Sequence, residues 1–236
     1  MEPFPKFKGS GDEMELEQKN LSKIDKVKIE ISEDFEFNDS ENMIQFKIVY
    51  WGPGESGKTT NFFRLREKFD SLKLTRGYSI ETTEGRTLWE DSLYLLFKFT
   101  LYDVKFNIIC HVVTCTGQER FLSTREYVLD GADGILFIGD SDPEKIEQNK
   151  RSFRELLSFA KPKKIPYLIQ LNKRDLENAI PMKDFKLHLG LPLQEKYPDG
   201  TYIVYPAEAL QGKNVVQCFK DLMLQVLFSY FKEESD

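Results

Sequence analysis

The sequence predicts an α/β domain whose mostly parallel, six-stranded sheet carries helices on both faces. Two observations lead to this fold class. After residue 43, short apolar runs alternate with longer amphipathic segments, an order typical of parallel sheets with crossover helices. A glycine-rich segment of the pattern G-x-x-x-x-G-K-T then joins the first apolar run to the first amphipathic segment. This is the strand-to-helix setting in which a phosphate-binding loop works.

The expected elements follow one another without any internal repeat. The strands are expected at 44–50, 93–101, 105–113, 135–139, 166–171 and 201–205, and the helices at 59–70, 143–160 and 213–231. The apolar residues of 93–101 and 105–113 fit the one antiparallel pair. Ligands of such a sheet bind where its strands reach their carboxyl ends.

Residues 1–43 are expected to form an acidic N-terminal extension, and residues 44–232 the main domain. Eleven Asp and Glu against six Lys fall in the first forty residues, so this leader carries most of the formal net charge of −6. Residues 1–25 are polar and show no period, which predicts disorder. Val27 and Ile29 alternate with charged residues, which predicts an extra strand or hairpin that pairs with the sheet or covers the last helix.

Charge and targeting signals narrow the function classes. The main domain is nearly neutral, so it has no basic stripe for nucleic acid or anionic lipid. The three cysteines lack C-x-x-C spacing and only two histidines are present, which disfavours a zinc site and favours reduced thiols in the cytoplasm. The chain starts without a secretion signal, and neither end carries a lipidation motif, since Glu2 excludes myristoylation. No direct membrane anchor is therefore expected.

The segment G-P-G-E-S-G-K-T at 52–59 is a complete phosphate-binding loop. Its glycines let successive backbone amides face a β-phosphate at the positive end of the following helix. Lys58 reaches the β- and γ-phosphate oxygens, and the Thr59 hydroxyl binds the Mg²⁺ that bridges them. The nucleotide-contacting candidates in this loop are Gly52, Gly54, Glu55, Ser56, Gly57, Lys58, Thr59 and Thr60. The alternative interpretation is a glycine turn with a surface lysine.

The segment L-N-K-R-D-L at 171–176 follows an apolar strand and contains the pattern N-K-x-D. Asp175 can accept hydrogen bonds from both N1–H and the exocyclic amine of guanine, a pair of donors that adenine lacks. Asn172 can bond the ring edge and tether the phosphate loop, and the stem of Lys173 can lie over the purine. Together with the phosphate loop, this pattern predicts GTP and GDP as ligands.

A second glycine turn, T-C-T-G-Q at 114–118, follows the apolar strand at 105–113. The Gly117 amide is placed to meet a γ-phosphate, and Gln118 is placed to orient an attacking water. Most Ras-like proteins have Asp at the first position of this pattern, where it holds Mg²⁺ through water. This chain has Thr114 instead.

Five segments of the chain carry a family signature. They are F-K-I-V-Y-W-G-P-G-E-S-G-K-T-T-N at 46–61, E-G-R-T-L at 84–88, T-C-T-G-Q at 114–118, G-I-L-F-I-G-D-S at 134–141 and Q-L-N-K-R-D-L at 170–176. Together they closely resemble the MglA polarity GTPases and their archaeal MglA-like relatives, a branch of the Ras-like superfamily in which the exchange of Thr for Asp also occurs. The resemblance covers residues 44–231 and implies a P-loop NTPase G domain of the small GTPase type.

The resemblance implies catalytic roles for Arg86 and Gln118. Arg86 matches the family's intrinsic arginine, which stabilises charge on the transferred phosphoryl group; a solvated switch residue is the alternative. Thr87 matches the switch threonine that binds Mg²⁺ and senses the γ-phosphate. Asp91 either replaces the missing carboxylate near Mg²⁺ or is a plain acid at a strand end. Gly54 leaves room for Gln118 and an arginine, which favours hydrolysis.

The resemblance also places a last base-contacting loop at P-A-E-A-L-Q-G, residues 206–212. In this loop the Ala209 amide is expected to face the guanine carbonyl, with Leu210 beside it. The family's usual Ser before this alanine is Glu208 here, so this loop departs from the pattern.

The last expected helix has two apolar faces. Its core stripe is Val215, Phe219, Leu222, Met223, Val226, Leu227 and Tyr230. Leu224, Phe228 and Phe231 fall on another side, where they either pack under the N-terminal extension or form a surface for a partner.

These observations predict a Mg²⁺-dependent, GTP-hydrolysing molecular switch with slow intrinsic turnover, in which Thr87 and Gly117 order two loops around the γ-phosphate. The alternative is a GTP-dependent scaffold with negligible hydrolysis, motivated by Thr114 and the acidic extension. A P-loop small-molecule kinase is disfavoured, because no arginine-rich lid segment is evident and N-K-x-D has no role there. The resemblance further implies a roadblock-domain partner of the MglB kind, a GTPase-activating protein or co-regulator that repositions Arg86 and Gln118.

Overall fold

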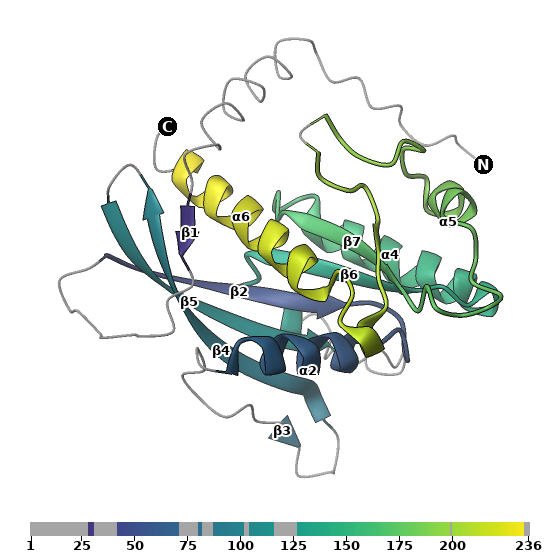
Figure 1. Ribbon diagram of the computed structural model, residues 1–236, viewed down its shortest axis with the longest axis horizontal. Coiled ribbons are helices and arrows are strands. Elements are labelled where there is room, and N and C mark those ends of the chain that lie inside the picture. The colour runs from purple at the N-terminus through teal and green to yellow at the C-terminus, as the bar shows by residue number, and fades with distance from the viewer. Residues whose placement is uncertain are drawn as a thin grey trace.

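The structure is a computed structural model of the 236-residue chain. It describes residues 28–30, 42–70, 80–81, 87–101, 104–115, 127–198 and 200–233. Figure 1 shows that one sheet runs through the molecule, with helices on either side of it.

Eight strands of the described residues form this sheet. They are β1 (Lys28–Glu30), β2 (Asn42–Trp51), β3 (Ile80–Glu81), β4 (Thr87–Leu101), β5 (Val104–Cys115), β6 (Gly134–Asp140), β7 (Tyr167–Asn172) and β8 (Tyr205–Pro206). Their order is β1-β4-β5-β2-β6-β7-β8, and β3 pairs with β4 beside this path. From β5 to β8 all neighbours run parallel, whereas β4 runs antiparallel to β5. The expected six-stranded, mostly parallel sheet is confirmed, and the short β1 and β3 extend it.

Helices cover both faces of the sheet. They are α2 (Lys58–Lys68), α4 (Ile146–Ala160), α5 (Met182–Leu189) and α6 (Val215–Glu233), with the 3-10 turns η3 (Pro143–Lys145) and η4 (Ala209–Gln211). Helices α2 and α6 share one apolar core with the sheet, and α4 and α5 share the other (Figure 1). Within the described ranges, no helix is long and apolar enough to cross a membrane.

The central strands are apolar on both sides because they lie between these two helical layers. All seven residues of β6 are buried. In β2, Ile48 and Tyr50 belong to the core under α2 and α6, whereas Val49 and Trp51 belong to the core under α4 and α5. This burial on both faces explains why the sequence of these strands reads as a continuous apolar run.

Two expectations for the C-terminal third of the chain are wrong. The strand expected at 201–205 is only the two-residue β8 (Tyr205–Pro206), because residues 201–203 pair with residues 195–197 instead of with β7. The structure also has a helix, α5, where none was expected. The signals for this helix are present in the sequence, since Pro181 precedes it and Gly190 ends it with a φ of 70°, the usual asymmetry of helix ends.

The β4 side of the sheet has more antiparallel pairing than expected, since both β1 and β3 pair with β4. Strand β1 falls where the sequence alternation predicted a strand, and it lies against residues 98–100 of β4. The expectations for residues 1–27 and 31–41, including disorder, fall outside the described residues.

Helix α6 buries most of its expected core stripe. Six of the seven stripe residues are buried, and the exception is Tyr230, which is 42% exposed near the end of the helix. On the second apolar face, Phe231 packs against Phe106 of β5 with 5.2 Å between ring centroids. Leu224 and Phe228 are half-buried. Their cover by the N-terminal extension stays a prediction.

Candidate nucleotide-binding site

The candidate site lies at the carboxyl edge of the sheet, where the parallel strands end side by side. Pairing aligns Tyr50 of β2 with Thr114 of β5 and Leu136 of β6. It also aligns Asp140 of β6 with Asn172 of β7. The phosphate loop, the end of β5 and the N-K-x-D segment therefore lie at one edge of the sheet, where ligands of parallel sheets bind.

The phosphate loop joins β2 to α2 along a tightly curled backbone. Its φ angles are positive at Gly52 (154°), Glu55 (65°) and Gly57 (94°). Gly57 is also the N-cap of α2. The first amides of a helix have no carbonyl partner within it, so the positive end of α2 opens toward this loop and favours an anion there.

Two glycines of the loop are required by close approaches of other elements. A Cβ atom on Gly52 would lie 2.2 Å from the carbonyl oxygen of Ile138 in β6. A Cβ atom on Gly57 would lie 2.2 Å from Nδ2 of Asn172 at the end of β7. The loop is thus packed directly onto the two strands that follow it in the sheet.

The interior of the loop holds a cation and an unsatisfied hydroxyl. Lys58 is only 4% exposed, and its Nζ donates to the carbonyl oxygens of Pro53 at 2.7 Å and Gly52 at 3.3 Å. The buried Oγ of Ser56 makes no hydrogen bond within the described part of the chain. Such a buried ammonium group beside curled backbone amides fits a phosphate ligand. Thr59 follows at the start of α2 and supplies the hydroxyl that Mg²⁺–nucleotide sites of this kind use, so the residues present fit both groups.

Asn172 connects the phosphate loop to the last expected base-contacting loop. Its Nδ2 donates to the carbonyl oxygen of Ser56 at 2.9 Å, which is the tether expected from the sequence. Its Oδ1 accepts from the backbone amide of Ala209 in η4, also at 2.9 Å. Because Asn172 is only 3% exposed, these bonds are shielded from water and fix the separation of the two loops.

Lys173 is held by a carboxylate that sequence reasoning missed. Its Nζ lies 2.8 Å from Oδ2 of Asp140, which is fully buried at the end of β6. The backbone of Asp140 is fixed in turn by Asn149 of α4, whose Oδ1 accepts from its amide and whose Nδ2 donates to its carbonyl, each at 2.9 Å. The signal for this role was a charged residue that ends an otherwise apolar strand.

The rest of the N-K-x-D segment is anchored through Arg174. Its Nη1 donates to the carbonyl oxygen of Ile180 at 2.6 Å and to Oγ of Ser141 at 3.2 Å. Burial lowers the pKa of Arg174, and the nearby Glu208 opposes this shift. Asp175, the next residue, is exposed, so its carboxylate is accessible to a ligand.

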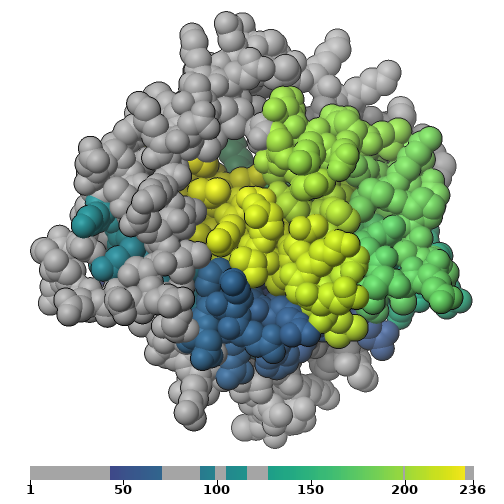
Figure 2. All heavy atoms as spheres, viewed as in Figure 1, coloured from purple at the N-terminus to yellow at the C-terminus, as the bar shows by residue number. Residues whose placement is uncertain are grey.

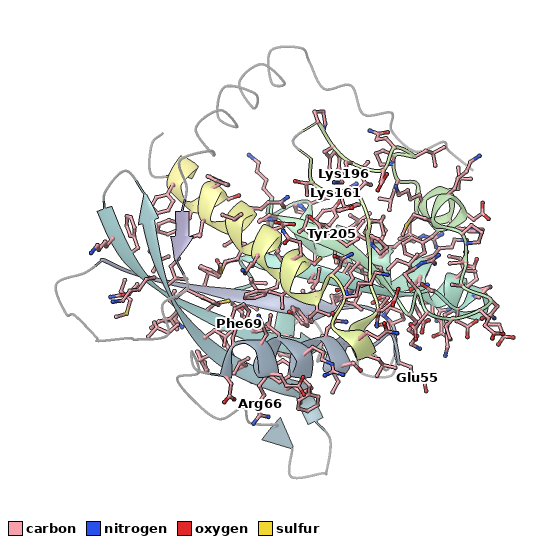
Figure 3. The ribbon with its side chains drawn as sticks, in the orientation of Figure 1. Glu55, Arg66, Phe69, Lys161, Lys196 and Tyr205 are labelled. Atoms are coloured by element: carbon pink, nitrogen blue, oxygen red, sulfur yellow. The ribbon has the colours of Figure 1, made fainter. Side chains whose placement is uncertain are left out.

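An ion pair connects the phosphate loop to η3. Oε2 of Glu55 lies 2.9 Å from Nζ of Lys145, and the Glu55 side chain is 78% exposed. Figure 3 shows Glu55 beside the end of α2 that begins in the phosphate loop. The hydrogen bond from Lys145 lowers the pKa of the Glu55 carboxyl and raises the pKa of the Lys145 ammonium.

Asp91 and Thr114 meet where β4 pairs with β5. The buried hydroxyl of Thr114 accepts a hydrogen bond from the backbone amide of Asp91 at 3.0 Å. A bulge between Trp89 and Ser92 interrupts the strand register here. Asp91 therefore lies inside β4, next to the residue that replaces the usual aspartate, and not at a strand end. Thr87 begins the same strand.

The loop at η4, which the sequence predicts to contact the base, differs from this expectation in one detail. The Ala209 amide, expected to face the guanine carbonyl, donates to Asn172. Ala209 is 2% exposed, whereas Leu210 is 67% exposed. Glu208, which stands where the family usually has Ser, accepts from Nζ of Lys213 at 2.6 Å.

Three candidate residues, Arg86, Gly117 and Gln118, lie outside the described residues. Their roles in hydrolysis stay predictions. The described part of the site therefore holds most of the residues expected to bind the phosphates and the base.

The link between these motifs defines a class of protein. Parallel α/β sheets with a phosphate loop serve many nucleotides. Direct coupling of that loop to an Asn-Lys-x-Asp turn, whose carboxylate suits guanine, identifies the G domain of a P-loop GTPase.

Comparisons with known proteins agree with this class. The model of the ADP-ribosylation factor family matches residues 35–226, so the chain belongs to this family. The chain is 37% identical over 159 residues to the mutual gliding-motility protein MglA of Myxococcus xanthus (strain DK1622), and this alignment covers 65% of this chain and 80% of that protein. It is 26% identical over 182 residues to ADP-ribosylation factor-like protein 6 of Caenorhabditis elegans, covering 76% of this chain and 85% of that protein. It is 28% identical over 148 residues to ADP-ribosylation factor-like protein 4A of Homo sapiens, covering 62% of this chain and 66% of that protein.

The chain is therefore an MglA-like small GTPase, which binds guanine nucleotides and hydrolyses GTP. The resemblance seen in the sequence is confirmed. The family match begins at residue 35, inside the expected extension, and the division into residues 1–43 and 44–232 stays a prediction.

Proposed function

We propose that this GTPase works as a cytoplasmic, Mg²⁺-dependent switch. In the GTP state two loops are ordered around the γ-phosphate, and in the GDP state they relax. The observation that carries the proposal is the pair of hydrogen bonds that Asn172 makes, donating to the carbonyl of Ser56 and accepting from the amide of Ala209. These bonds hold the phosphate grip and the base-contacting loop at one fixed separation, which a whole nucleotide can span.

The phosphate end of the nucleotide binds in the loop at 52–60. Lys58 gives up its bonds to the loop carbonyls and donates to the β- and γ-phosphate oxygens, while the backbone amides around Gly57 face the β-phosphate. Thr59 and Thr87 hold Mg²⁺ through their hydroxyls, with Asp91 as the nearby carboxylate. When bound, Mg²⁺ neutralises charge on the β- and γ-phosphate oxygens.

The guanine end binds over the N-K-x-D segment. The exposed carboxylate of Asp175 accepts from N1–H and the exocyclic amine, and this pair of bonds excludes adenine. Lys173 lies over the purine with its ammonium group on Asp140, which supports its fixed position. The loop at Ala209 and Leu210 faces the guanine carbonyl.

Hydrolysis follows from residues placed around the γ-phosphate. Gln118 orients a water whose oxygen attacks the γ-phosphorus while the bond to the β–γ bridging oxygen breaks. The products are GDP and inorganic phosphate, which takes up both protons of the water. Arg86 and the Gly117 amide stabilise the charge that develops on the phosphate oxygens. Gly54 has no side chain that would obstruct Gln118.

A regulator of the roadblock-domain kind, similar to MglB, accelerates this slow step by placing Arg86 and Gln118. The family membership supports this partner, since the relative with 37% identity is MglA. Adding a roadblock-domain protein from the same genome should raise the hydrolysis rate of the wild type and not that of Arg86→Ala. An equal increase in both would exclude action through Arg86.

Single-turnover phosphate release tests the switch directly. Gln118→Leu and Arg86→Ala should each lower the rate at least tenfold, because each removes a group that acts in the transition state. Gln194→Leu, at an exposed position far from the motifs, is the matched control and should keep the wild-type rate. Equal, near-zero rates in the wild type and both site variants, with GDP binding intact, would favour the scaffold. ATP binding as tight as GTP binding in calorimetry would revive the kinase interpretation.

A further inference from the structure

We propose that Arg64 is a positioning residue for guanine recognition, because it ties the helix of the phosphate loop to the turn whose free amide, at Leu210, reads the guanine carbonyl. This inference rests on the proposed function. It adds a residue of α2 to the recognition of the base and moves the carbonyl-reading amide by one position.

The contact that carries this inference joins residues 146 positions apart in the chain. Nη2 of Arg64 donates to the carbonyl oxygen of Leu210 in η4. Nη1 of the same guanidinium lies 2.8 Å from Oε2 of Glu67, one helical turn further along α2. In Figure 2 the blue surface of α2 adjoins the yellow surface of the C-terminal segment that contains η4 and α6. Arg64 thus spans the junction between two elements of the site.

The amides of η4 show which donor is left for a ligand. Ala209 donates to Asn172, Gln211 donates to the carbonyl of Glu208, and Gly212 donates to the carbonyl of Ala209. Within the described residues, none of the hydrogen bonds of this turn uses the Leu210 amide as donor. A free backbone N–H beside the N-K-x-D segment matches the O6 acceptor of guanine and rejects the amine donor that adenine carries at the same place.

The turn η4 has three residues, and backbone bonds from Gln211 and Gly212 close it. Leu210 itself is 67% exposed, so contacts with other elements set where its amide lies. Asn172 holds the turn before Leu210, through Ala209. Arg64 holds the turn on the other side of the Leu210 amide, through its hydrogen bond to the carbonyl oxygen of Leu210. The Leu210 N–H lies between these two anchors, so loss of the Arg64 contact releases it on one side.

A pair of nucleotides separates recognition of the carbonyl from nucleotide binding in general. GDP and 6-thio-GDP share the phosphates, the N1–H and the exocyclic amine, but the sulfur of 6-thio-GDP is a weak acceptor. Dissociation constants for both are measured with the wild type, Arg64→Met, Arg64→Lys and Arg66→Met. Met keeps the length and apolar stem of Arg and removes its donors.

Arg64→Met should bind GDP about fivefold to tenfold more weakly than the wild type, in the range of one lost charge-assisted hydrogen bond. Its affinity for 6-thio-GDP should change less, so that the preference for GDP falls at least threefold. Arg64→Lys should restore part of this preference. Arg66→Met should match the wild type, since Arg66 lies on the side of α2 toward β3 (Figure 3).

The outcomes distinguish this inference from the function on which it rests. Equal weakening of both nucleotides in Arg64→Met, or an unchanged preference for GDP, would overturn the role of Arg64 alone. A wild type that binds GDP no better than 6-thio-GDP would overturn the role of the Leu210 amide. A wild type that binds neither nucleotide would overturn the proposed function itself. Glu67→Gln gives an independent variant that retains Arg64, and it should reproduce the loss of preference in weaker form.

Discussion

The nucleotide-binding edge and the β4–β5 flank of one sheet differ in how their buried amides are paired. At the edge, Asn149 and Asn172 are almost fully buried, and all four of their amide atoms make hydrogen bonds. On the flank, Asn107 of β5 is 0% exposed, and neither of its amide atoms has a hydrogen-bond partner among the described residues. A buried polar group costs free energy unless it is paired. At Asn149 and Asn172 polar burial therefore specifies the geometry of the edge, whereas at Asn107 it lowers stability.

Asn172→Ala should have the largest effect, because it removes both bonds that join the phosphate loop to η4. GDP affinity should fall about a hundredfold, or ~3 kcal/mol, since the Ser56 carbonyl and the Ala209 amide both lose their partners. Titration with a fluorescent GDP analogue measures this loss. Asn178→Ala, at an exposed position of the same segment, is the control. Affinities within twofold of each other for the two variants would contradict the bridging role.

Asn149→Leu should lower the free energy of unfolding by about 2 to 4 kcal/mol. The substitution leaves the buried backbone amide and carbonyl of Asp140 unpaired, and each such group costs about 1 to 3 kcal/mol. Denaturant unfolding of the nucleotide-free protein measures the difference. A variant as stable as the wild type would show that these bonds do not hold the end of β6.

Asn107→Leu should act in the opposite direction and raise the free energy of unfolding by about 1 to 2 kcal/mol. It replaces an unpaired buried amide by an apolar side chain of similar size. The same denaturant experiment applies, so the two Asn→Leu variants are direct counterparts. A destabilised Asn107→Leu would remove the contrast between the edge and the flank.

His111 on the flank should give the smallest effect, as a dependence of stability on pH. Its ring stacks on Tyr94 with 4.1 Å between centroids, and its Nε2 lies 2.8 Å from Oγ of Ser92. Burial, and secondarily the charge of Lys47, lower the pKa of His111 to about 4. The unfolded chain, with a pKa near 6.5, therefore takes up a proton first, so stability is lost as the pH falls from about 6.5 to about 4.

Because His111 is only partly buried, the loss between pH 7 and pH 5 should be about 1 kcal/mol. Melting temperatures of the wild type and His111→Gln across this range measure it, and the variant should show the shallower slope. His188→Gln, at an exposed position of α5, should keep the wild-type slope. Parallel slopes for the wild type and His111→Gln would exclude this source of pH dependence.

The sequence predicts best those features that depend on neighbours in the chain. The alternation of apolar runs and amphipathic segments predicted the sheet and the helices on both its faces. The phosphate loop and the N-K-x-D segment were found from their own residues, because each motif needs a local backbone shape. Their meeting at one sheet edge followed from the common direction of parallel strands.

Features that join distant residues could not be predicted in this way. No local pattern shows that Asp140 would hold Lys173, or that Arg64 would reach Leu210. The short β8 was missed because residues 201–203 pair with residues 195–197, which no local pattern indicates. Thr114 could be read only as a departure from a pattern until the structure placed it against the backbone of Asp91. Arg86 and Gln118 stay predictions.

The close approach of Gly57 to Asn172 has a consequence for protein engineering. The space that a methyl group at position 57 would fill is already taken by the amide nitrogen of Asn172. A phosphate loop transplanted into another protein would therefore need a matching asparagine at the end of the second strand along the sheet, because the loop without this asparagine leaves a gap, and the asparagine without the glycine gives a clash. The two sequence signatures should be inherited, swapped or redesigned only as a pair.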